Sequence, residues 1–164
     1  TFLLVTHDQD EALSLSQYVA LMNRGTIEQV ADPATLYRRP ATLFAARFVG
    51  AGTFLPATVI DQSGADAAVA IEGMRFMAED AGVAAGKPAT VMLRPEDIDV
   101  VGPGQGRCDG AVQTCAFFGA FYEATVAASL GLFRVRSPWP LPQGENVGLN
   151  WSNRAGIAYP DEGG

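Results

Sequence analysis

Short apolar runs separated by turn residues fill the sequence between residues 52 and 160. Gly64 and Gly73 mark two of the turns, and apolar positions such as Val69 and Ile71 alternate with neighbours on the other face. We predict strands at residues 54–61, 67–71, 74–78, 89–93, 110–118, 121–129, 132–136 and 146–151. Many short strands with few helical stretches indicate a β-barrel or a β-sandwich.

The first 50 residues combine helix signals with a hairpin. Asp32 followed by Pro33 is a favoured helix start, and Thr42 is a suitable N-cap. We predict helices at residues 8–17, 33–37 and 43–48, and hairpin strands at residues 18–22 and 27–30. Gly50 and Gly52 suggest a hinge. The predicted domains are therefore residues 1–52 and 53–160, followed by a polar tail at residues 161–164.

His7 is the one histidine of the chain, and it lies between an apolar run and a helix start. Residues 2–5 are continuously apolar, which predicts a strand buried on both faces. Asp8 is a good N-cap, and Glu11 can close a capping box with it. This order would present the imidazole at the carboxyl end of a strand, where α/β sheets bind ligands. His7 is thus the candidate catalytic and ligand-binding residue; the alternative is a solvated loop histidine.

The segment Val-Thr-His-Asp-Gln-Asp-Glu-Ala-Leu, residues 5–13, closely resembles the switch-histidine loop of ATP-binding cassette (ABC) transporter ATPases. Further segments follow in that family's order: Met-Asn-Arg-Gly at 22–25, Ile-Glu-Gln-Val at 27–30, Asp-Pro at 32–33, Leu-Tyr-Arg-Arg-Pro at 36–40 and Phe-Val-Gly at 48–50. They look like the importer subgroup. The resemblance implies the C-terminal portion of such an ATPase, in which His7 contacts the γ-phosphate of ATP and helps to orient the attacking water.

The sequence lacks the other motifs of that nucleotide site. It contains no G-x-x-x-x-G-K-[ST] loop, and its one lysine, Lys87, precedes a proline. Without that loop there are no backbone N–H groups arranged around the phosphates, and the Mg²⁺ ligands are missing as well. ATP and Mg²⁺ are therefore expected as cofactors of a full-length parent ATPase. This chain by itself is expected to bind no cofactor and to hydrolyse no ATP.

Two segments of the second half resemble the regulatory extension of these importer ATPases. Leu-Arg-Pro-Glu-Asp-Ile, residues 93–98, resembles its Arg-Pro-Glu-Asp segment, and Phe-Phe-Gly-Ala, residues 117–120, resembles its Phe-Leu-Gly turn. That extension carries small oligonucleotide-binding-like (OB-like) barrels called TOBE domains. The expected fold is therefore mainly β, with an OB-like (TOBE) β-barrel regulatory domain preceded by the α/β C-terminal tail of an ABC ATPase domain. Glu96 and Asp97 are expected to satisfy free N–H groups of the turn that Pro95 begins.

The resemblance also implies partners and a location. In the family the barrel joins two ATPase subunits as a homodimer, and permease subunits hold the ATPase peripherally on the inner, cytoplasmic face of the plasma membrane. A periplasmic or extracellular binding protein completes the complex. The transported solute cannot be read from this sequence, because its selectivity lies in other subunits. The alternative is a stand-alone barrel that senses a small oxyanion or metabolite and has no ATPase role.

Composition limits the partners further. The net charge is −7, so the surface should repel phosphate backbones, and nucleic acid is not an expected partner. No run of about 18 apolar residues exists that would predict a membrane span. Cys108 and Cys115 lie seven positions apart around one predicted strand, which favours two free thiols over a disulfide or metal site.

Aromatic residues gather at positions 117, 118, 121 and 122. They could stack nucleobases, but no stripe of interleaved Lys and Arg accompanies them. A core or dimer contact is the favoured interpretation, as it is for Trp139 and Trp151.

Overall fold

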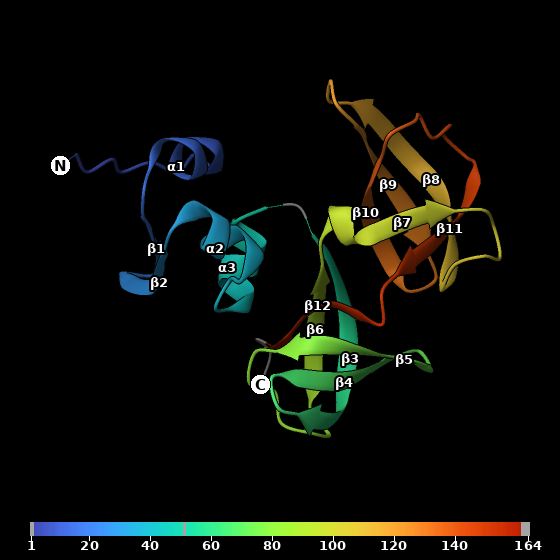
Figure 1. Cartoon of the computed structure of the whole chain (residues 1–164), viewed down its shortest axis with the longest axis horizontal. Coiled ribbons are helices and arrows are strands. Elements are labelled where there is room, and N and C mark those ends of the chain that lie inside the picture. The colour runs from blue at the N-terminus through green and yellow to red at the C-terminus, as the bar shows by residue number, and fades with distance from the viewer. Residues whose placement is uncertain (1, 51, 162–164) are drawn as a thin grey trace. The chain divides into compact units, whose positions relative to one another are not determined.

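The computed structural model describes residues 2–50 and 52–161, which divide into two compact units after Gly50 (Figure 1). The N-terminal unit contains α1 (Gln9–Leu15), the hairpin β1 (Val19–Asn23) and β2 (Thr26–Ala31), α2 (Pro33–Arg38) and α3 (Leu43–Phe48). Asp32 and Thr42 cap α2 and α3 as predicted, accepting hydrogen bonds from backbone N–H groups three residues later at 3.0 and 3.1 Å. One cluster of its buried core consists of Val19, Leu36 and Val49, and Leu21, Leu43, Ala45 and Ala46 are buried as well.

The prediction of a buried strand at residues 2–5 is wrong. These residues form neither strand nor helix, and Phe2 and Val5 are 103% and 89% exposed. A strand needs a neighbour for its backbone hydrogen bonds, and no strand of the described chain pairs with this segment. The following helix is also shorter than predicted, because Ser16 at its C-cap is already extended, and Leu15 is 74% exposed.

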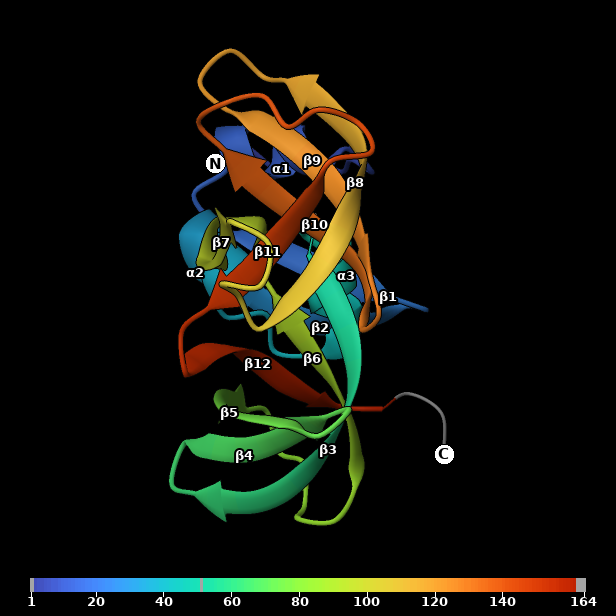
Figure 2. The ribbon, with the colours of Figure 1, turned by 90° about the vertical axis from the view of Figure 1, so that its right-hand side faces the viewer.

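The second unit consists of two connected β structures (Figure 2). Strands β3 (Thr53–Ser63), β4 (Asp66–Ile71), β5 (Met74–Asp80), β6 (Pro88–Leu93) and β12 (Arg154–Pro160) close a barrel in the order β12-β5-β4-β3-β6. Strands β7 (Ile98–Val101), β8 (Cys108–Phe117), β9 (Tyr122–Ala128), β10 (Gly131–Ser137) and β11 (Asn146–Trp151) form a sheet in the order β10-β9-β8-β11-β7. The mainly β, OB-like fold class is confirmed.

All eight strands predicted after residue 52 are present, with ends shifted by a few residues at most. Two further strands, β7 and β12, were not predicted. β7 is only four residues long, and Gly156 interrupts the pattern of β12. This glycine is required: its φ is +78°, and a Cβ there would collide with the backbone oxygen of Met92. β12 closes the barrel by pairing antiparallel with β6 and parallel with β5.

The barrel and the sheet share one hydrophobic core. Trp151 at the end of β11 is 1% exposed and packs edge-on against Phe76 of β5, with ring centroids 5.9 Å apart. The same indole stacks on Phe133 of β10 at 5.7 Å. Arg107 covers this cluster: its Nε donates to the Trp151 carbonyl at 2.8 Å, and its guanidinium carbon lies 5.5 Å from the indole. These contacts fix the sheet against the barrel.

Candidate functional site

His7 lies on an exposed bend directly before α1, in a backbone held by short-range hydrogen bonds. The Asp8 carboxylate accepts from the N–H groups of Asp10 and Glu11 at 2.9 and 3.1 Å. The Asp8 N–H donates to Thr6 Oγ1 at 3.0 Å, and the Thr6 hydroxyl donates to Glu11 Oε2 at 2.9 Å. One half of the expected capping box is therefore present, the bond from the Glu11 N–H to the Asp8 carboxylate, while the Glu11 carboxylate accepts from the Thr6 hydroxyl and not from the Asp8 N–H.

The imidazole of His7 makes no hydrogen bond or ion pair with the described residues. It does not sit at the rim of a buried strand, because residues 2–5 form no strand. An ordered backbone with an exposed imidazole leaves both ring nitrogens available to a ligand or another chain.

The N-terminal unit exposes apolar side chains on one face of its hairpin. One face of the β1–β2 hairpin pairs Met22 with Ile27 and Ala20 with Val30. Met22, Ile27 and Val30 are between 56% and 59% exposed, in addition to the exposed segment 2–5. Isolated exposed apolar residues are ordinary, but a strand face of this kind normally packs against other protein.

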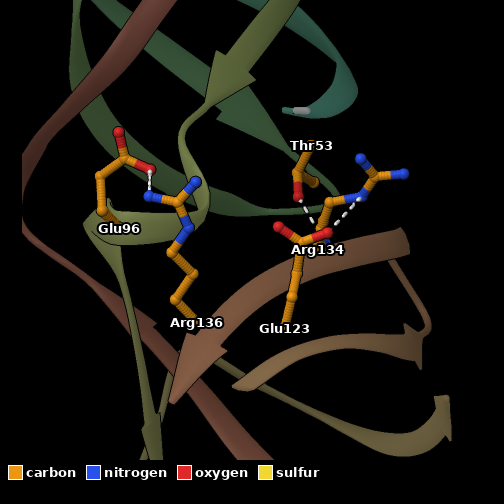
Figure 3. Close-up of polar contacts among 5 residues, drawn as sticks. All are labelled: Thr53, Glu96, Glu123, Arg134 and Arg136. Atoms are coloured by element: carbon orange, nitrogen blue, oxygen red, sulfur yellow. Dashed lines mark hydrogen bonds and ion pairs between the residues drawn. The ribbon is translucent and has the colours of Figure 1, made fainter. Parts of the chain in front are cut away.

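In the second unit, the Arg94–Asp97 segment forms a tight turn between barrel and sheet. Pro95–Asp97 is a single 3₁₀ turn, and the Asp97 N–H donates to the Arg94 carbonyl at 3.0 Å. The Arg94 side chain at the N-cap makes no capping bond, whereas the Asp97 carboxylate accepts a hydrogen bond from the Arg94 backbone, as predicted for Asp97. Glu96 pairs with Arg136 of β10, Oε2 to Nη1, at 3.5 Å (Figure 3). Burial, and then the neighbouring carboxylate of Glu96, raise the pKa of Asp97.

A second polar contact joins β10 to the barrel. The N–H of Arg134 donates to the hydroxyl of Thr53, which is 1% exposed, at 3.0 Å (Figure 3). The Arg134 side chain pairs with Glu123 of β9 at 3.8 Å. Alternation in the sequence indicates that Arg134 points outward, but it gives no sign of a partner 81 positions earlier in the chain.

The aromatic residues of the β8–β9 hairpin lie at its tip rather than in the core. Phe117 and Phe118 are 63% and 59% exposed. Phe117 packs on Tyr122 with centroids 4.9 Å apart, and Phe118 stacks on Phe121 at 5.7 Å. The sequence analysis favoured a core or a dimer contact for these residues, and a core position is wrong for Phe117 and Phe118. Trp151 is a core residue, as expected.

Cys108 and Cys115 are free and half-buried thiols. Burial, with a smaller contribution from the Asp109 carboxylate, raises the pKa of Cys108 to about 11. The neutral thiol therefore predominates at physiological pH, and a reactive role for Cys108 is not supported. Residues 2–50 and 52–161 contain no group of three or more His, Cys, Asp and Glu that could hold a metal ion. No helix in that same part of the chain has the length and hydropathy needed to cross a bilayer.

Comparison with known proteins shows which families this chain resembles. Residues 91–158 match the family model for the TOBE domain. This part of the chain is therefore similar to a TOBE domain. The matched region begins in β6 and ends in β12, so it contains the Arg94–Asp97 turn and the whole five-stranded sheet.

Most of the chain also resembles proteins named spermidine/putrescine import ATP-binding protein PotA. It is 36% identical to the protein of Desulfitobacterium hafniense over 149 residues, which are 91% of this chain and 42% of that protein. It is 34% identical to the protein of Spiroplasma citri over 153 residues, which are 93% of this chain and 43% of that protein. The chain thus spans less than half the length of these relatives. Together with the TOBE domain, these matches confirm the resemblance to the C-terminal part of an ABC importer ATP-binding subunit.

One solved structure, the cytoplasmic molybdate-binding protein ModG with molybdate bound, resembles the fold. It covers 66% of this chain and 96% of its own, with a TM-score of 0.53 and 16% identity. At that identity the likeness concerns the fold alone.

Proposed function

We propose that this chain supplies the C-terminal portion of the ATP-binding subunit of an ABC importer. The observation that carries the proposal is the similarity to PotA proteins over more than 90% of the chain, together with the match of residues 91–158 to the TOBE domain. The exposed apolar face of the N-terminal unit supports it, since such a face suits a unit that packs on the rest of a larger domain.

Within that subunit, His7 is the proposed contact to the γ-phosphate of ATP. An imidazole can donate to a phosphate oxygen while helping to orient the attacking water. The residues of this chain fit that one contact, because His7 is exposed and its backbone is held by Thr6, Asp8 and Glu11. They do not fit Mg²⁺ or the remaining phosphates, for which the sequence holds neither a P-loop nor a paired Asp-Glu strand end. Bound Mg²⁺ would neutralise phosphate charge through residues outside this sequence.

The proposed role of the TOBE domain is regulatory: it joins two ATP-binding subunits as a homodimer. Permease subunits and a periplasmic or extracellular binding protein are the further proposed partners. In this arrangement the protein is peripheral on the cytoplasmic face of the plasma membrane. Both relatives are named for spermidine and putrescine import, which favours polyamines as the solute.

The test replaces His7 in a full-length subunit that carries this sequence. His7→Ala should lower ATP hydrolysis about 100-fold or more, as the loss of one transition-state hydrogen-bond donor does elsewhere. ATP binding should change little, and Gln17→Ala, at an exposed position past the end of α1, should leave hydrolysis unchanged. Near-normal hydrolysis by His7→Ala would remove this histidine from the mechanism.

The second candidate is a stand-alone barrel that senses a small oxyanion or metabolite. Its support is the likeness in fold to ModG, which was solved with molybdate bound. Titration calorimetry of this chain with molybdate and with phosphate distinguishes the two candidates. Saturable binding of either anion would favour the sensor, whereas the importer subunit requires none.

A further inference from the structure

The bend that carries His7 is tied to helix α1 by the side chains of Thr6 and Glu11. Thr6 Oγ1 accepts from the Asp8 N–H at 3.0 Å, so this hydrogen bond spans the histidine. The same hydroxyl donates to Glu11 Oε2 at 2.9 Å. Glu11 lies in the first turn of α1, and its own N–H donates to the Asp8 carboxylate at 3.1 Å. The residues before and after His7 are therefore both bonded to the same turn of the helix.

The chemistry of these groups gives the bonds a fixed direction. An ionised carboxylate accepts hydrogen bonds and cannot donate them, so Glu11 takes the single hydroxyl proton of Thr6. The lone pairs of Thr6 Oγ1 are then left for the N–H of Asp8. A charged acceptor strengthens its bond, and bonds that follow one another in a chain reinforce each other. Glu11 thus orients Thr6, and Thr6 holds the turn around His7.

The bend has little other support in the described chain. Residues 2–5 form neither strand nor helix, so no regular element holds the segment before Thr6. Helix α1 has seven residues, none of them buried. The short-range bonds of Thr6 and Glu11 are therefore the feature that keeps the backbone at His7 in one conformation.

We propose that Thr6 and Glu11 are positioning residues for His7. This role rests on the proposed function, because it concerns the contact between His7 and the γ-phosphate proposed there. A hydrogen-bond donor to a reacting phosphate has to be in place before the reaction, since a displacement of about 1 Å can cost about 100-fold in rate. Neither Thr6 nor Glu11 touches ATP in this role; both act through the backbone that carries the imidazole.

The first experiment measures the motion of the His7 amide in this chain by ¹⁵N relaxation. Its order parameter should lie near about 0.8, and Glu11→Ala and Thr6→Val should each lower it to about 0.6 or below. Thr6→Ser keeps the hydroxyl and should keep the parent value. An equally mobile His7 in the parent chain, or a rigid one in both Glu11→Ala and Thr6→Val, would overturn the positioning role.

Asp10→Ala is the matched control, because Asp10 is also an acidic residue of the first turn of α1. Asp10 enters the local bonds through its backbone, which donates to Asp8 and accepts from Ser14. Losing its carboxylate has the same effect on the charge near the helix start as Glu11→Ala, but it leaves the Thr6 hydroxyl bonded. The order parameter of His7 should therefore not change.

The second experiment measures ATP hydrolysis by a full-length subunit that carries this sequence. Glu11→Ala and Thr6→Val should each lower kcat about 10-fold and leave KM for ATP within about twofold, because the imidazole remains but is less well placed. Thr6→Ser and Asp10→Ala should stay near the parent rate. In a His7→Ala background, Glu11→Ala should cause no further loss, because the group that it positions is absent.

The outcomes separate the positioning role from the proposed function. Near-normal hydrolysis by His7→Ala would remove both. If His7→Ala is impaired while Glu11→Ala and Thr6→Val hydrolyse ATP normally, the positioning role alone is wrong. It is also wrong if Glu11→Ala lowers kcat by the same factor with and without His7, since a general structural defect would do that. Should Glu11→Ala lose helix α1 in its NMR spectrum, Thr6→Val, which leaves the helix residues intact, decides in the same two backgrounds.

Discussion

Truncation of Trp151 should measure how much the core shared by the barrel and the sheet contributes to the free energy of unfolding. The indole is 1% exposed and touches Phe76 from the barrel and Phe133 from the sheet. Its Nε1–H has no hydrogen-bond partner among the described residues. Trp151→Ala removes the contact between the two β structures, whereas Trp151→Phe keeps a ring in the same place and removes the N–H.

The two substitutions should differ strongly in size. Removing a buried tryptophan to alanine costs about 3–5 kcal/mol, and the loss of two aromatic contacts places Trp151→Ala at the upper end. Trp151→Phe loses part of the ring area, worth about 1–2 kcal/mol. It also removes a buried N–H group that has no hydrogen-bond partner, and this should stabilise the fold by about 1–3 kcal/mol. The free energy of unfolding should therefore fall by no more than about 1 kcal/mol for Trp151→Phe.

The assay is urea denaturation followed by far-ultraviolet circular dichroism at a few micromolar protein. Trp139→Ala, at an exposed position, is the matched control and should stay within about 0.5 kcal/mol of the parent chain. A loss below about 1.5 kcal/mol for Trp151→Ala would refute the shared core. A loss of about 3 kcal/mol for Trp151→Phe would mean that the indole N–H is hydrogen-bonded after all.

Three further outcomes follow from the β unit. Thr53→Val should cost about 1–2 kcal/mol by leaving the Arg134 N–H without its acceptor, and Thr53→Ser should cost less than half of that in the same denaturation assay. Labelling of Cys108 by iodoacetamide, measured in a Cys115→Ala background, should keep accelerating with pH to about 11, and a plateau near pH 9 would contradict the effect of burial. Because burial and Glu96 raise the pKa of Asp97, its folded carboxyl holds its proton more tightly than the unfolded one. Its contribution to stability is full below the unfolded pKa of 3.8 and is lost as pH rises through the folded value, so Asp97→Asn should raise the urea midpoint at pH 7 and not at pH 3.

Local chemistry explains which elements could be predicted. The caps at Asp32 and Thr42 and the alternation in β4 and β10 act over a few residues, so their signals lie in the sequence itself. Residues 2–5 show the limit of that reasoning. Their apolar run is compatible with a buried strand, but a strand exists only where another strand accepts its hydrogen bonds.

For the candidate site, the sequence identified His7 and the motifs around it, and the TOBE domain is confirmed by the family match. The sequence did not indicate the ion pair between Glu96 and Arg136. Glu96 and Arg136 lie 40 positions apart on a turn and a strand, and only the closing of the sheet brings them to 3.5 Å. The role of His7 stays a prediction.

The sequence by itself determined the mainly β composition of this chain, its helix caps, its turns and the family that it resembles, because each depends on neighbouring residues or on a recognisable motif. Tertiary structure alone decided that β12 returns to close the barrel, that Trp151 joins barrel and sheet, and that Phe117 and Phe118 face solvent. Those outcomes depend on pairings between residues far apart in the chain. Their free energy comes from packing across strands, which no local pattern records.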